Sequence, residues 1–238
     1  MKNSRQSLLL ILFSCLLSVS VKATWSIIII DPVTKEIGIA GASCTPNVYG
    51  IGGIIPGKGA VIVQAMSNKL AQMKGLQMIM ANAAPEDILK AMMDPMYDPE
   101  SQQYAIISLN YIDKAVTYTG SKTTTFNGAQ KAKGISVQGN TLTTADEIQT
   151  IMDVALKAQR DSLNITDVLM KALEAGSESG GDKRCGSQKA TSAFITVAKP
   201  GDNANSPYLN LVIKGISKGE ENAVEELRKK YDAWKAKN

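Results

Sequence analysis

The pattern of hydrophobic and polar positions changes repeatedly along the chain between strand-like and helix-like stretches. Short runs of β-branched and aliphatic residues between turn residues are typical of strands, and apolar positions that recur every three or four residues are typical of helices. The predicted strands cover residues 26–30, 36–43, 60–64, 103–110, 114–120, 134–138, 191–198 and 208–214. The predicted helices cover residues 70–80, 85–93, 144–160, 164–175 and 220–237.

This order of elements predicts the architecture. Strand groups alternate with helix pairs, and neighbouring strands are separated by connections of hairpin length, which favours antiparallel sheets. We therefore predict an α+β fold of four layers, an αββα sandwich in which two antiparallel sheets are flanked by helices.

Glycine-containing segments supply the predicted turns and helix ends. The glycine-rich stretch over residues 50–59 lacks the lysine and the spacing of a phosphate-binding loop, so we interpret it as a bend between strands. Asn127-Gly128 is typical of a turn, and Gly176 is expected to end the helix over 164–175.

The helix predicted over residues 70–80 carries an apolar stripe. Leu70, Met73, Leu76, Gln77 and Met80 recur at helical spacing. We interpret the methionines as core residues rather than as a ligand-binding group, because methionine commonly fills core space.

The first 23 residues resemble an export signal. Lys2 and Arg5 precede an apolar stretch over residues 7–21, and Val21-Lys22-Ala23 offers a small residue for cleavage. We predict a signal peptide over 1–23 and a single mature domain over 24–238, located in the periplasm or secreted. Cleavage after Ala23 would make Thr24 the first residue of the mature protein.

Two alternatives to this interpretation stay open. Residues 12–15 loosely match a lipidation motif at Cys15, although Phe13 fits it poorly, and lipidation there would leave Thr24 internal. Thr24 could also be an ordinary strand residue that follows a signal peptide. A membrane anchor is disfavoured because the apolar run is shorter than the roughly 20 residues that a spanning helix needs.

Charge and composition disfavour a nucleic-acid partner. Removal of Lys2, Arg5 and Lys22 with the leader lowers the formal net charge from +4 to +1 and leaves 215 residues, enough for one buried core. Aromatic residues make up only 5% of the chain, so stacking surfaces for single strands are scarce.

Histidine and cysteine counts limit the chemistry. The chain has no histidine, which excludes Ser-His-Asp and Cys-His mechanisms and removes the commonest zinc ligand, and we predict neither a metal nor a cofactor. Cys44 and Cys185 would remain in the mature chain, as one disulfide or as two free thiols. A nucleophile needs another base, and a free α-amine at Thr24, with a reference pKa near 7.7–8.0, can serve.

Several short blocks, taken in order, resemble those of the DUF1028 family. The opening Thr24-Trp25-Ser26-Ile27 with Asp31-Pro32 is similar, and the later blocks follow in order and spacing over nearly all the mature chain. These later blocks are residues 36–40, 42–43, 64–65, 67–68, 75–76, 119–121, 137–140, 180–182 and 184.

The resemblance implies an assignment to the N-terminal nucleophile (Ntn) hydrolases. It implies an αββα sandwich with the nucleophile at the start of the first strand and an amide-cleaving activity of unspecified substrate. The sequence departs from the family pattern at residues 185–187 and lacks an aromatic run after Ser43, two places where specificity would be set.

Thr24, Asn140 and Ser43 are the candidate catalytic residues. The Thr24 amine would take the proton of its own hydroxyl, directly or through one water, so that the oxygen attacks a carbonyl. Asn140, with the amide of Gly139, is the candidate for stabilising the oxyanion, and Ser43 could hydrogen-bond Thr24. A strand-ending turn at Gly139-Asn140 and simple packing of Ser43 are the structural alternatives.

Gln64, Asn68, Gly139, Asp182 and Arg184 are the candidate substrate-binding residues. Asp182 could hold the protonated amine and Arg184 could bind a substrate carboxylate, but a salt bridge that fixes their loop is the favoured alternative. Gln64 and Asn68 could line the pocket, or act as turn and cap residues.

The function predicted from these features is hydrolysis of a small amide, an acylated amino acid or a peptide. The alternative is a secreted binding or surface-structure protein that has the same fold without the reaction. A homodimer is compatible with a sheet protein of this size.

Overall fold

The computed structural model describes residues 24–238. The predicted signal peptide and Cys15 lie outside the described residues. The strands are β1 (Thr24–Ile30), β2 (Ile37–Ser43), β3 (Gly52–Ile55), β4 (Gly59–Ala65), β5 (Gln102–Ser108), β6 (Val116–Thr119), β7 (Gly128–Ala132), β8 (Ile135–Asn140), β9 (Ser192–Ala198) and β10 (Leu209–Ile213). The α-helices are α1 (Lys69–Met80), α2 (Pro85–Met92), α3 (Glu147–Arg160), α4 (Ile165–Glu178) and α5 (Ala223–Lys235).

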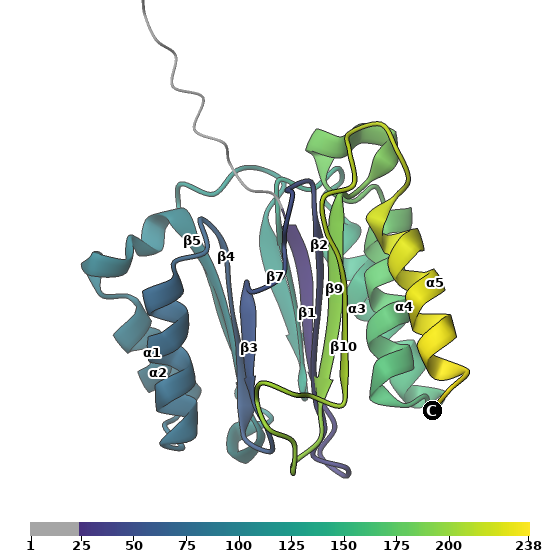
Figure 1. Cartoon of the computed structure of the whole chain (residues 1–238). Helices are drawn as coiled ribbons and strands as arrows, with labels where there is room; N and C mark the ends of the chain where they lie inside the picture. The colour runs from purple at the N-terminus through teal and green to yellow at the C-terminus, as the bar shows by residue number, and fades with distance from the viewer. Residues whose placement is uncertain (1–23) are drawn as a thin grey trace, which may run out of the picture.

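Two antiparallel sheets lie face to face between layers of helices. One sheet has the strand order β10-β9-β2-β1-β8-β7 and the other has the order β3-β4-β5-β6. Helices α1 and α2 cover the outer face of the smaller sheet, and α3, α4 and α5 cover the outer face of the larger one (Figure 1). This arrangement confirms the predicted α+β fold of two antiparallel sheets with helices outside.

Strand β1 is buried on both faces because helices cover one side of the larger sheet and the smaller sheet covers the other. Trp25, Ile27 and Ile29 pack with the core beneath α3 and α4, whereas Ile28 and Ile30 pack in the core between the two sheets. Successive side chains of a strand point to opposite faces, so a strand covered on both sides needs a continuous apolar run. The run of isoleucines in β1 meets that need.

The two edge strands β3 and β7 were missed by the sequence prediction. Residues 50–59 were predicted as a bend, but β3 forms there and pairs with β4. The turn predicted at Asn127-Gly128 is also wrong, because Gly128 begins β7, which pairs with β8. Each strand begins with glycine and pairs with a single neighbour, the strand that directly follows it in the chain, so its propensity signal is weak.

The end predicted for the fourth helix is wrong as well. Helix α4 continues through Gly176 to Glu178. A Cβ atom at Gly176 would lie 2.4 Å from Nε1 of Trp25, and that indole donates to the carbonyl of Leu173 at 3.2 Å. Glycine is therefore required here for close packing of the helix on β1 rather than for ending the helix.

Helix α1 buries a different face from the predicted one. Its buried residues are Ala71, Gln72, Gly75 and Ile79, whereas Leu70, Met73 and Met80 are exposed. A Cβ atom at Gly75 would lie only 2.9 Å from the sulfur of Met92, so the helix approaches its neighbours through its smallest residues. The prediction that Met73 and Met80 are core residues is therefore wrong.

Candidate functional site

Thr24 occupies the first position of β1, at one end of the layer between the sheets. It is paired in register with Asn140 of β8, and its carbonyl accepts a hydrogen bond from Nε2 of Gln64 in the facing sheet at 3.3 Å. The residue also borders a cavity of about 170 Å³. The other residues around this cavity are Thr45, Asn47, Val48, Tyr49, Gly50, Ile51 and Ser67.

A buried network of polar side chains connects the two sheets beneath Thr24. Ser26 Oγ donates to Oε1 of Gln64 at 2.5 Å, and Gln64 Nε2 donates to Oε1 of Gln103 at 2.6 Å. Within the larger sheet, Gln138 Nε2 donates to Ser26 Oγ at 2.7 Å, and Ser136 Oγ donates to Gln138 at 2.8 Å. All five side chains are fully buried, so these directional contacts fix how the sheets are placed beside Thr24.

Gln103 determines the orientation of Asn140. Its Nε2 donates to the hydroxyl of Thr119 at 2.9 Å and to the carbonyls of Gly128 and Gly139 at 3.0 Å each, so its Oε1 must be the atom that faces the site. Asn140 Nδ2 donates to that Oε1 at 3.3 Å.

The carbonyl oxygen of the Asn140 side chain, Oδ1, is buried and unpaired within residues 24–238. Asn140 therefore presents an acceptor at the end of β8, in register with Thr24. A donor such as an α-ammonium group suits this atom better than an oxyanion does.

Asp182 and Arg184 form the ion pair that was considered as the structural alternative. Arg184 Nη2 lies 2.7 Å from Asp182 Oδ2, and Arg184 Nε donates to Oδ1 at 3.0 Å. The fully buried carboxylate also accepts the backbone amide of Cys44 at 2.6 Å. Arg184 Nη2 reaches Ser43 Oγ at 3.5 Å. The pair thus ties the loop after α4 to the end of β2, next to the first residue of β1.

A disulfide strengthens the same junction. Cys44 and Cys185 are bonded, with Cα atoms 5.5 Å apart and a sequence separation of 141 residues. Of the two states left open by the sequence, the structure contains the disulfide.

The segment between β4 and α1 has an uncommon backbone on the other side of Thr24. Ala65 and Ser67 have positive φ values of 68° and 56°, which non-glycine residues rarely adopt. Asn68 then caps α1, because its Oδ1 accepts the amides of Leu70 and Ala71. Its side chain acts as a helix cap, whereas Ser67, which the prediction overlooked, lines the cavity.

Glu147 is a second buried polar position, behind the larger sheet. Both of its carboxylate oxygens lack a hydrogen-bond partner within the described part of the chain. Burial raises its pKa to about 8, although the nearby backbone amides of Thr143 and Gly181 favour the ionised form. The side chain is therefore mostly protonated at neutral pH.

The structure gathers most of the predicted site residues at one end of the sheets, with different individual contacts from those predicted. Gln64 supports Thr24 from below, and Gly139 accepts from Gln103 through its carbonyl. Gln103, Ser26 and Gln138 were overlooked. Polar residues at alternate positions of otherwise apolar strands, such as 136, 138 and 140, were the signal that could have identified this end.

Residues 24–238 contain neither a candidate metal-ion cluster nor a membrane-spanning helix. That part of the chain has no group of three or more acidic, cysteine or histidine residues placed to hold a metal ion. It also has no helix with the length and apolarity needed to cross a bilayer.

Comparison with known proteins establishes the family. Residues 24–227 match the model of a family of unknown function, DUF1028, and the chain belongs to this family. The fold is similar to the crystal structure of protein SPO2555 from Silicibacter pomeroyi, also described as DUF1028, with a TM-score of 0.74 and 22% sequence identity over 89% of this chain and 88% of the other. No protein with a curated description matches the sequence.

Proposed function

We propose that the chain is an exported hydrolase of the Ntn type that uses Thr24 as its nucleophile on a small amide or peptide-like substrate. The observation that carries this proposal is the position of Thr24, which begins a central strand, borders a cavity and is paired with Asn140, whose buried Oδ1 lacks a partner within residues 24–238. An α-amine created there by cleavage after Ala23 would give that acceptor a donor.

The reaction would proceed through an ester. The Thr24 amine accepts the hydroxyl proton, Oγ forms a bond to the substrate carbonyl carbon, and the C–N bond then breaks as the proton passes to the leaving amine. Water attacks the resulting ester, restores the hydroxyl and releases the carboxylic acid. Gln64 would hold the Thr24 backbone during these steps, and the Asp182–Arg184 pair would hold the neighbouring loop.

Export has independent support in the disulfide. Structural disulfides persist mainly in oxidising compartments such as the periplasm and the extracellular space, and Cys44 and Cys185 are bonded. The intact mass of protein exported with its own leader tests both points. A mass corresponding to residues 24–238 is expected, and a lipidated Cys15 or another first residue would contradict the proposed nucleophile.

The nucleophile is tested by covalent labelling. Protein that begins at Thr24, prepared by removing a tag with a protease, is incubated with a β-lactone probe and analysed by mass spectrometry. We expect one adduct on Thr24, reduced labelling in Thr24→Ser, and none in Thr24→Ala or in protein that keeps an extra N-terminal residue. If the extended protein is labelled as fast as the protein that begins at Thr24, the mechanism is wrong and the non-catalytic binding protein is favoured.

A further inference from the structure

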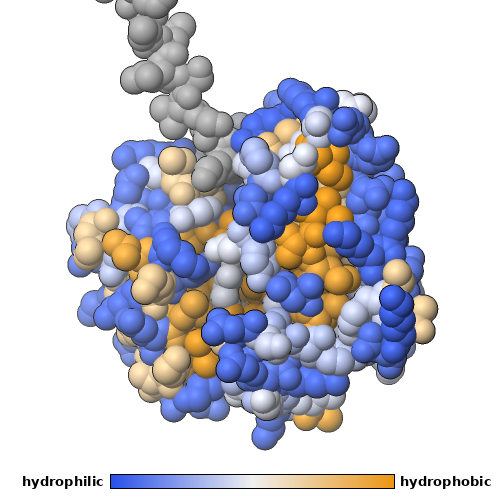
Figure 2. Space-filling view, viewed as in Figure 1, coloured by the Kyte–Doolittle hydropathy of each residue, from blue (hydrophilic) through white to orange (hydrophobic). Residues whose placement is uncertain are grey.

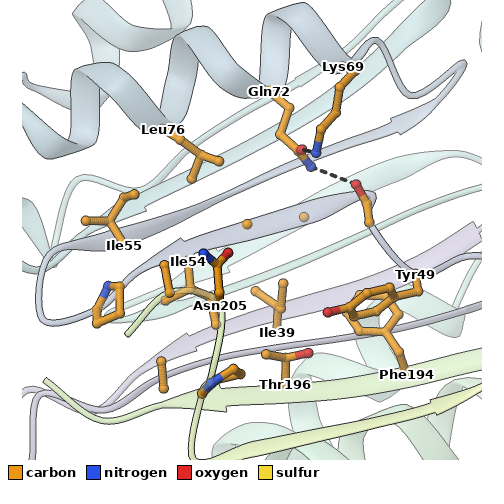
Figure 3. Close-up of a pocket in the computed structure, with 17 residues that line it drawn as sticks. Ile39, Tyr49, Ile54, Ile55, Lys69, Gln72, Leu76, Phe194, Thr196 and Asn205 are labelled. Atoms are coloured by element: carbon orange, nitrogen blue, oxygen red, sulfur yellow. Dashed lines mark hydrogen bonds between the residues drawn. The ribbon is translucent and has the colours of Figure 1, made fainter. Parts of the chain in front are cut away.

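A second, larger cavity lies between the open edges of the two sheets. Its volume is about 350 Å³, which is within the usual size range of ligand pockets. Ile39 and Phe194 line it from the larger sheet, and Ile54 and Leu76 line it from β3 and α1 (Figure 3). Hydrophobic residues are exposed on this face over both sheets (Figure 2). The cavity therefore has an apolar wall and opens to the surface, and its polar lining includes Lys69, Gln72, Thr196 and Asn205.

The glycines of β3 leave room for the side chains that form this cavity. A Cβ atom at Gly52 would lie 2.8 Å from Cδ1 of Ile39, and one at Gly53 would lie 2.6 Å from Cδ1 of Leu76. Larger residues at these positions would displace both side chains. The apolar lining thus depends on the glycines that concealed β3 from the sequence prediction.

The larger cavity adjoins the Thr24 cavity. Tyr49 and Gly50 line both of them, so this short segment forms their common wall. The wall is held from both sides, because the Gly50 carbonyl accepts Nε2 of Gln72 at 2.9 Å and the Tyr49 ring packs edge-on against Phe194 with centroids 5.7 Å apart. Figure 3 shows Gln72 and Tyr49 at the same end of the larger cavity.

We propose that the larger cavity binds the aliphatic acyl group of the substrate while the amide carbonyl lies at Thr24. This inference rests on the proposed function and adds a substrate class, amides of aliphatic carboxylic acids. Apolar side chains from both sheets suit an alkyl chain, and because Tyr49 and Gly50 border both cavities, a substrate that lies across this segment would place its two ends in them.

Binding is measured apart from catalysis. The Thr24→Ala protein, beginning at residue 24, is titrated with butanamide, hexanamide and octanamide by calorimetry. Burial of each methylene is expected to tighten binding about fourfold. Equal affinity for the three amides would overturn the proposal.

Two pairs of variants locate the alkyl chain. Ile54→Asp places a charge in the cavity and Ala204→Trp narrows its rim, so both should abolish the dependence on chain length. Ile112→Asp is the control for the first variant, because Ile112 packs against the same inter-sheet core without lining the cavity. Ala236→Trp is the control for the second, because Ala236 is an exposed alanine directly after the last helix. Retention of the dependence in both cavity variants would place the alkyl chain elsewhere and contradict the proposal.

Hydrolysis of the same three amides distinguishes failure of the acyl site from failure of the proposed hydrolase. If the protein beginning at Thr24 hydrolyses all three with equal kcat/KM, the acyl site is wrong and the hydrolase stands. If octanamide binds tightly to the Thr24→Ala protein, with the dependence located by the variants, and the Thr24 protein hydrolyses none of the amides, the hydrolase is wrong and the acyl site stands.

Discussion

The layer between the two sheets has a polar end and an apolar end, and they are held together differently. Near Thr24, glutamine and serine side chains bond across and along the sheets. At the other end, Ile28 and Ile30 pack against Ile62 and Ile107 of the smaller sheet. Apolar packing is non-directional, whereas a buried hydrogen-bond network fixes particular atoms. The apolar end therefore contributes mainly to stability, and the polar end mainly to the placement of Thr24.

The largest effect is expected from removing the disulfide that closes the polar end. In the loop-entropy account, opening a loop closed over 141 residues costs about 5 kcal/mol of unfolding free energy. Chemical denaturation of the Cys44→Ser/Cys185→Ser protein checks this value. Wild type held in reductant serves as the control and should approach the variant. An unchanged denaturation midpoint would show that the ion pair alone closes this end.

A smaller loss of stability is expected from a cavity at the apolar end. Ile28→Ala should lower the unfolding free energy by about 3 kcal/mol, and Ile28→Val by about 1 kcal/mol, because Ile28 is fully buried between the sheets. Probe labelling of Thr24 in the folded protein should remain near the wild-type rate. A parallel loss of labelling and stability would mean that the two ends do not have separate roles.

At the polar end we expect the opposite: a smaller loss of unfolding free energy and a larger loss of probe labelling at Thr24. Gln103→Leu removes the acceptor of Gln64 and Asn140, so we expect a loss of about 2 kcal/mol. Displacement of Thr24 should slow probe labelling by about tenfold or more. Gln77→Leu, on the exposed side of α1, is the matched control. Normal labelling in Gln103→Leu would remove the positioning role of the network.

The smallest effect on stability is expected at Glu147, where, within residues 24–238, a buried polar side chain lacks the hydrogen bonds that Gln103 has. Glu147 is buried like Gln103 but lacks partners within the described residues, and its pKa is raised to about 8. Its folded state holds the proton more tightly than the unfolded state, so stability falls as the pH rises from about 4.5 to about 8 and then levels off.

Glu147→Gln should remove that pH dependence. We expect a gain of about 1–2 kcal/mol at pH 9 and little change at pH 4, less than the full pKa shift implies because a buried amide would also need partners. Thermal unfolding at the two pH values measures this difference, and Glu86→Gln on the exposed side of α2 is the control. A gain of equal size at both pH values would assign the effect to packing.

Local patterns predicted elements better than they predicted contacts. The isoleucine run of β1 and the helical spacing that begins at Leu70 predicted a strand and a helix start close to the observed ones. The face of α1 was predicted wrongly because hydrophobic spacing favoured Leu70 and Met73, whereas close packing selected Ala71 and Gly75. Size, rather than hydrophobicity, decided that interface.

The candidate site was predicted in part because its residues come from distant segments. Thr24 followed from the predicted cleavage position. Asn140 and Asp182 were predicted from the chemistry that a nucleophilic threonine needs, and they lie near it through the β1–β8 pairing and the contact with Cys44. The partner of each side chain was not predictable, since Gln103 was known only as part of a strand. Its role depends on facing Gln64 and Asn140 across the layer, which a local pattern does not encode.

The strand order also bears on the sequence of events in folding. The smaller sheet is built from one continuous stretch, residues 52–119, whereas β1 and β2 need β8 and β9, which lie more than a hundred residues further along the chain. Contacts between distant residues form slowly, because a long loop must close first. We expect the smaller sheet with α1 and α2 to assemble early, and the surroundings of Thr24 to be completed last, once β8 and β9 have joined β1 and β2.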